Sequence, residues 1–92
     1  MLSPYLAEFL GTFFFLFVIL FTGDAYMIGL ALTIAILIGG SISGGNYNPA
    51  VSVMMVFAGK LPLSKLLPYI IAQILGGVGA YILYKNVKRF KL

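Results

Sequence analysis

Residues 43–52 read Ser43-Gly44-Gly45-Asn46-Tyr47-Asn48-Pro49-Ala50-Val51-Ser52, and this stretch decides the fold. Asn is a favoured N-cap and Pro is favoured at the first helical position, so Asn48-Pro49 predicts the start of a helix. The apolar residues that follow run to Gly59, where a helix is expected to stop. A helix of about 11 residues is ~16 Å long, which is half the thickness of a bilayer core.

The residues before this helix are rich in glycine. Residues 39–47 include four glycines within seven positions, and we expect irregular backbone there because glycine disfavours helix. Irregular backbone is tolerated at membrane depth only where it is buried in protein or lines a water-filled cavity. A helix lying flat on the membrane surface would carry Lys or Arg on one face, and residues 50–58 have neither. The sequence therefore predicts a re-entrant loop and half-helix over residues 43–58.

The composition requires lipid as the solvent. Of the 92 residues, 62% are hydrophobic and 9% are charged, whereas soluble domains are about a quarter charged. Three apolar segments, 5–22, 25–42 and 64–84, are long enough to cross the hydrocarbon layer. We predict a multi-pass, all-α integral membrane protein with three transmembrane helices and one re-entrant half-helix, forming a single unit over 1–92 with a basic tail at 85–92.

Small residues recur along the predicted spans at helical spacing. Such residues let neighbouring helices approach closely, so they predict helix-packing faces. The residues in these faces are Gly11 in the first span, Ala31, Ala35 and Gly39 in the second, and Ala72, Gly76 and Ala80 in the last.

Several classes of function are disfavoured by what the chain lacks. There is no His and no Cys, and the only carboxylates are Glu8 and Asp24. No metal site, cofactor site or nucleophile–base pair can be assembled from this set, so we expect no enzyme. The net charge of +4 comes largely from lysines that flank apolar segments, which is typical of a membrane protein and not of a nucleic-acid binder. Asp24 follows Gly23 and is expected to be a turn residue.

Three blocks of sequence resemble the aquaporins, the major intrinsic protein family. Residues 43–52 resemble the first signature loop, residues 7–12 (Ala-Glu-Phe-Leu-Gly-Thr) resemble the first-helix motif, and residues 59–62 with 69–77 resemble the third helix. The resemblance implies that Asn48 donates to solutes in a pore and that Pro49 and Ala50 pack against a partner half-helix. It also implies that Glu8 accepts hydrogen bonds from the loop backbone.

Two residues in these blocks, Glu8 and Gln73, have a second interpretation. Glu8 could instead be a side chain that reaches the membrane surface from near a helix end. Gln73 is predicted either to support the loop or to bond between helices.

The chain departs from the family in carrying one half. Relatives have two halves of inverted topology. The resemblance therefore implies a pore completed by an inverted second copy or by a separate second half, and four such pores in an assembly. Lys60 and Lys65 lie on one side of the membrane, while Lys85, Lys88, Arg89 and Lys91 lie on the other. Positive charge on both sides predicts insertion in both orientations.

The selectivity filter is the second departure. Relatives usually place an Arg after the second such motif, where this chain has Val51. Alignment on the motif puts the other filter positions at Ile28, Ile36 and Gly45. An apolar filter predicts passage of water and of small neutral solutes such as glycerol.

Two alternatives to a passive channel stay open from the sequence. One is a non-conducting half-channel subunit that modulates or packs with another membrane channel. The other is a small proton-driven transporter, in which Glu8 would be the titrating carboxylate.

Overall fold

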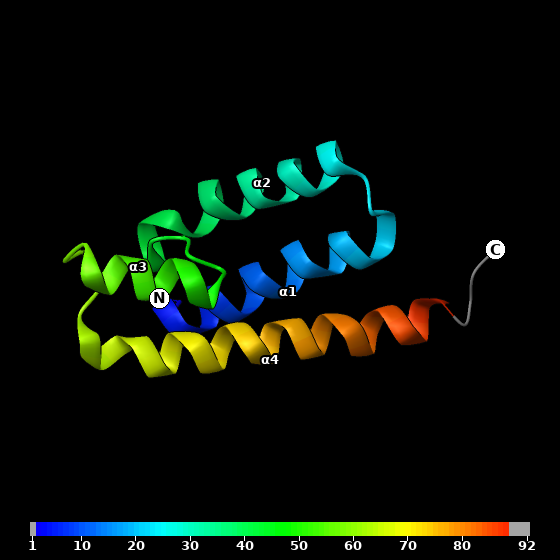
Figure 1. Cartoon of the computed structure of the whole chain (residues 1–92). Helices are drawn as coiled ribbons and strands as arrows, with labels where there is room; N and C mark the ends of the chain where they lie inside the picture. Colours follow the sequence, from blue (N-terminus) through cyan, green and yellow to red (C-terminus); the bar gives the residue numbers. More distant parts are fainter. Residues whose placement is uncertain (1, 89–92) are drawn as a thin grey trace.

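The computed structural model describes residues 2–88, which form four α-helices and no strand (Figure 1). The helices are α1 (Pro4–Thr22), α2 (Ala25–Ser43), α3 (Pro49–Phe57) and α4 (Leu63–Lys88). Helices α1, α2 and α4 are long and apolar enough to cross a membrane. The predicted fold class is confirmed: this is an all-α, multi-pass integral membrane protein.

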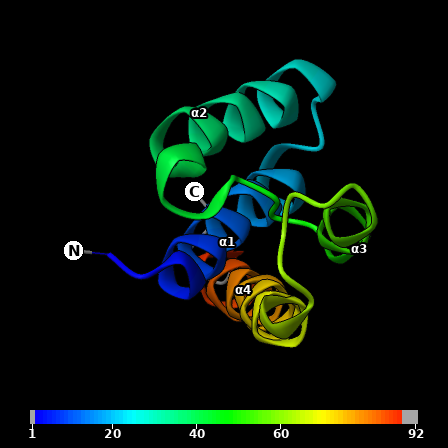
Figure 2. The same cartoon turned by 90° about the vertical axis from the view of Figure 1, so that its left-hand side faces the viewer.

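Helix α1 is the centre of the arrangement. It lies between α2 and α4 and packs against both, while α3 packs against α4 (Figure 1). Viewed from the end, α3 lies to one side of α1 (Figure 2). The chain after α2 turns back into the molecule, and α3 then leads out to the end at which α2 finished and α4 begins (Figure 1). This path is re-entrant.

The link between α1 and α2 consists of Gly23 and Asp24. Gly23 closes α1 in the left-handed conformation, with a φ of 66°. Asp24 is the N-cap of α2, and its side chain accepts a hydrogen bond of 2.8 Å from the Met27 amide. A link this short makes α1 and α2 antiparallel neighbours.

The irregular segment is shorter than the sequence predicted. We expected irregular backbone from Gly39, but α2 continues through Gly39 and Gly40 to Ser43. The helix ends at Gly44, whose φ is 90° and whose amide donates to the Gly40 carbonyl at 2.9 Å. Gly39 has an ordinary helical backbone that does not require glycine. Glycine is needed there because a Cβ would overlap the Tyr47 side chain, which packs against the helix.

The boundaries of α3 and α4 also differ from those predicted. Helix α3 has 9 residues, with Ala58 as C-cap and Gly59 at a φ of 74°. Helix α4 runs past the predicted boundary at residue 84, so Lys85 and Lys88 are helical. Basic side chains are favourable in the last turn of a helix because they face its negative end. The remaining predicted tail residues, Arg89 and Lys91, lie outside the described part.

The small residues of α2 and α4 face the inside of the molecule. Gly76 shows how close the helices come: a Cβ there would lie 2.8 Å from the Phe9 carbonyl oxygen of α1. Only a residue without a side chain allows α1 and α4 to pack at this separation. The buried small residues are Ala31, Ala35, Gly39, Ala72, Gly76 and Ala80.

Candidate functional site

The centre of the site is the Glu8 carboxylate on α1, which is 0% exposed. Its Oε2 accepts hydrogen bonds from the Ser43 hydroxyl (2.6 Å) and the Asn46 amide (3.0 Å). Its Oε1 accepts from the Tyr47 amide (2.8 Å) and from Nε2 of Gln73 (2.9 Å). One carboxylate thus joins α1, the end of α2, the loop 44–48 and α4. Complete burial contradicts the reading of Glu8 as a side chain that reaches the membrane surface.

A second shared acceptor, the Ser52 hydroxyl, attaches α3. Its oxygen accepts from Nδ2 of Asn46 (2.8 Å) and from Nε2 of Gln73 (2.8 Å). The Gln73 amide nitrogen therefore bridges Glu8 and Ser52. Gln73 thus forms a hydrogen bond between helices, to α1, and a second one to the half-helix that follows the loop. The two interpretations of this residue are compatible.

Tyr47 fills the space between α1 and α2. Its ring lies against Gly11 and Gly39, where a Cβ at either position would overlap ring or hydroxyl atoms. Its hydroxyl donates to the Ala35 carbonyl at 2.6 Å. We predicted that Gly11 and Gly39 allow direct contact between helices. They instead make room for the Tyr47 ring between α1 and α2.

Tyr69 of α4 holds the C-terminal end of α2. Its hydroxyl donates to the Ser43 carbonyl at 2.7 Å, and its ring meets that of Tyr5 edge-on with centroids 5.8 Å apart. The sequence reasoning did not single out Tyr69 or the other polar residues of this network, Ser43, Asn46, Tyr47 and Ser52. A signal existed for Ser52, which follows Asn48 by four residues in an otherwise apolar helix and so shares its face.

The supported loop presents an exposed tip, which we define as Asn48, Pro49 and Ala50. Oδ1 of Asn48 accepts from the Ala50 amide at 2.8 Å, as in an N-cap. An amide N–H can only donate, so the atom it meets must be the side-chain oxygen, and Nδ2 is directed away from this bond. Among residues 2–88, Asn48 Nδ2 has no hydrogen-bond partner, so the tip presents a donor at the positive end of a helix.

The filter candidates fall into two places. Gly45 and Ile36 are adjacent, since a Cβ on Gly45 would lie 3.4 Å from Cγ1 of Ile36. Val51 is half-buried in the first turn of α3. Ile28 lies eight residues before Ile36 on α2, which corresponds to ~12 Å along the helix. One chain alone therefore does not bring these four residues into a ring.

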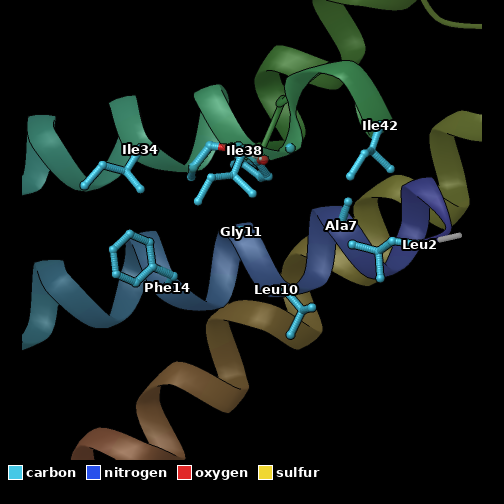
Figure 3. Close-up of a pocket in the computed structure, with 11 residues that line it drawn as sticks. Leu2, Ala7, Leu10, Gly11, Phe14, Ile34, Ile38 and Ile42 are labelled. Atoms are coloured by element: carbon cyan, nitrogen blue, oxygen red, sulfur yellow. Dashed lines mark hydrogen bonds between the residues drawn. The ribbon is translucent and has the colours of Figure 1, made fainter.

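A groove of about 360 Å³ lies between α1 and α2 (Figure 3). Leu10 and Phe14 contribute from α1, and Ile34, Ile38 and Ile42 from α2. Tyr47 also lines the groove, but the tip residues do not. The groove is therefore separate from the surface that presents Asn48.

Comparison with known proteins agrees with this geometry. A profile of the family described as "Major intrinsic protein" matches residues 1–91. The chain is 42% identical to "Glycerol uptake facilitator protein-like 6" of Lactiplantibacillus plantarum, over 92% of this chain and 44% of that protein. It is 45% identical to "Aquaporin Z" of Brucella melitensis, over 87% of this chain and 42% of that protein.

A third relative is the "Probable glycerol uptake facilitator protein" of Thermotoga maritima. It is 38% identical over 90% of this chain and 43% of its own length. The chain thus spans less than half the length of these curated relatives. With a match over nearly all of its own length, the chain belongs to the major intrinsic protein family.

Proposed function

We propose that this chain forms a passive channel for water and small neutral solutes such as glycerol, with two inverted copies making one pore. The observation that carries the proposal is the exposed tip of α3, which is supported by buried hydrogen bonds of the residues around it. The relatives named as glycerol facilitators and an aquaporin support the same class of solute.

The tip has the chemistry to select neutral solutes. The first amide groups of a helix lack intrahelical partners, and the N-terminus carries about half a positive charge. Such an end repels cations, including hydronium, while the Asn48 amide donates to a passing oxygen. A pore built this way passes hydrogen-bonding neutral molecules and opposes proton flow.

The exposed outer face of α3 supports an inverted partner. Within residues 2–88, α3 packs against α4, and its outer side chains Val53, Met54 and Phe57 are exposed. A second copy related by a two-fold axis in the membrane plane would place tip against tip, because such an axis pairs a surface patch with itself.

The lysines are compatible with both orientations. Lys60 and Lys65 lie before and at the start of α4, and Lys85 and Lys88 lie in its last turn, across the membrane span. Because positive charge flanks both faces, the positive-inside preference for either orientation is weak. By resemblance to relatives, four pores, and hence eight chains, would form the full assembly.

The inverted pair also explains the separation of the filter residues. Ile36, Gly45 and Val51 belong to the half of the molecule near the loop, while Ile28 lies near the opposite membrane face. In an inverted pair, Ile28 of one copy approaches the other three in its partner, which gives one apolar ring at each mouth. Without an Arg, these rings admit glycerol-sized solutes.

Proton-driven transport is disfavoured by the surroundings of Glu8. Its two oxygens already accept four hydrogen bonds, and the side chain has no exposed surface. A carboxylate that carries protons along a pathway needs access to that pathway. The bonds to the Asn46 and Tyr47 amides support a role for Glu8 in holding the loop.

Reconstitution of the purified chain alone tests the proposal. Proteoliposomes should shrink in stopped-flow osmotic experiments several-fold faster than protein-free vesicles, and glycerol should enter them. Val51→Trp, which fills the passage beside the tip, should abolish both fluxes, whereas Leu63→Trp at the exposed start of α4 should not. Inserted, folded chain that adds no flux would support the non-conducting subunit instead.

A further inference from the structure

We propose that Tyr47 is a positioning residue that sets the bore of the passage, and that its hydroxyl determines which solutes pass. The inference rests on the proposed channel function. Tyr47 is 2% exposed and does not belong to the tip, but it directly precedes Asn48 in the chain.

Tyr47 contacts the rest of the protein through its amide, its ring and its hydroxyl. Its amide donates to Oε1 of Glu8 at 2.8 Å, its ring lies against Gly11 of α1 and Gly39 of α2, and its hydroxyl donates to the Ala35 carbonyl at 2.6 Å. These contacts fix the residue relative to both helices. Because Asn48 follows at once, they also fix where the tip stands.

The backbone of Tyr47 shows that these contacts outweigh a local preference. Its φ is 56°, in the left-handed region that a bulky side chain rarely adopts. A residue is held in such a conformation only when its surroundings impose it. The ring contacts and the hydroxyl bond, together with the amide bond to Glu8, therefore keep the chain in the turn that orients Asn48.

The Tyr47 hydroxyl bond lies where it can influence the width of the proposed passage. Ala35 directly precedes Ile36, which lies against Gly45 in the wall of the proposed passage. The bond from Tyr47 thus sets the position of the loop along α2, and with it the distance that the tip projects beyond Ile36. Without that bond, the ring contacts and the amide bond to Glu8 remain, but the tip is held less tightly along α2, and larger solutes gain room.

The test compares Tyr47→Phe with Tyr26→Phe in proteoliposomes. Both variants lose one tyrosine hydroxyl, but Tyr26 is 88% exposed on α2, away from the loop. Permeation of water, glycerol and erythritol is measured for each. A loss of folded pores lowers all three fluxes in proportion, so the ratios between solutes isolate the bore.

We expect Tyr47→Phe to raise the glycerol-to-water and erythritol-to-water ratios by roughly threefold or more, on the scale of one hydrogen bond. Tyr26→Phe should leave the ratios at the wild-type value. Wild-type conduction with unchanged ratios in Tyr47→Phe would overturn this inference and leave the channel standing. Absence of any wild-type flux would overturn both.

A second measurement follows the position of α3 without using flux. Spin labels at Leu37→Cys and Phe57→Cys, positions 77% and 88% exposed, report the distance between α2 and α3 in chain diluted with unlabelled protein. The chain has no native cysteine, so these are the only labelled positions. The distance distribution should broaden on Tyr47→Phe, and an unchanged distribution would refute the positioning role.

Discussion

At the scale of single residues, the site depends on placing polar groups where lipid surrounds the protein. A buried polar group without a partner is costly, and a buried charge more so. The Glu8 carboxylate and the Ser52 hydroxyl each serve as acceptors for more than one donor. Within the irregular backbone over residues 44–48, the amides of Asn46 and Tyr47 donate to Glu8, and these bonds stabilise the segment inside the molecule.

Glu8→Gln should destabilise the protein. The new amide group would place N–H donors against the donors of Tyr47 and Gln73 or of Ser43 and Asn46, leaving buried donors unpaired at a cost of about 1–3 kcal/mol each. The measurement is the temperature at which the detergent-purified protein loses its single size-exclusion peak. Asp24→Asn is the control, since Asn caps a helix as well as Asp does at an exposed position.

The flux of Glu8→Gln separates the channel from the transporter. Under the channel account, any remaining folded protein conducts water, and a pH gradient has no effect on solute entry. A variant that keeps its stability and assembly but loses all transport would instead favour a titrating role for Glu8.

Sequence reasoning found the residues with a recognisable motif and missed those that act through three-dimensional contact. Asn48 could be predicted as an N-cap because Pro49 follows it. Tyr47 could not, because its ring contacts residues of α1 and α2 that lie far away in the sequence. The same holds for Asn46, whose side-chain hydrogen bond to Ser52 exists only once α3 folds back beside α4.

At the scale of elements, the packing is set by side-chain volume more than by helix propensity. The number and order of the helices could be predicted because apolar segments in lipid must satisfy their own backbone groups as helices. The predicted span to residue 42 ends one residue before α2 does, but irregular backbone was wrongly expected from Gly39, because glycine is typical of helix breaks. The structure uses Gly39 to accept the Tyr47 side chain within a continuous helix.

Gly11→Ala should disrupt the contact between α1, α2 and the loop. The added Cβ overlaps the Tyr47 ring, so the ring or the helices must move, at a cost of about 1–3 kcal/mol. Gly29→Ala is the matched control, because a Cβ there meets nothing within 4 Å and alanine favours helix. Thermal stability in detergent should fall for Gly11→Ala only. Equal stability of the two variants would contradict the packing described for Tyr47.

At the scale of the whole molecule, the proposed pore takes one half from each of two chains. The structure measures 47 × 26 × 23 Å, long enough in one direction to cross a membrane. Its tip and the outer side of α3 face away from α4. A homodimeric pore from such a chain requires copies in both orientations.

Orientation can be measured with a single cysteine in this cysteine-free chain. Asn86→Cys is exposed near the end of α4, and a membrane-impermeant maleimide applied to intact cells should label about half of the molecules. Replacing Lys60 and Lys65 by Gln should shift the population to one orientation and reduce flux, since unpaired copies accumulate. Complete labelling or none in the unaltered background would exclude the homodimer.

The most direct measurement of the central claim is a disulfide between tips. Ala50→Cys places one cysteine on each tip, and a two-fold axis through the passage brings the two sulfurs together at mid-membrane. Ser64→Cys, at the membrane-face end of α4, is the control, because an inverted pair holds its two copies on opposite faces. Oxidation in membranes should give a covalent dimer for Ala50→Cys and none for Ser64→Cys. Dimers through Ser64→Cys with none through Ala50→Cys would contradict the inverted pore.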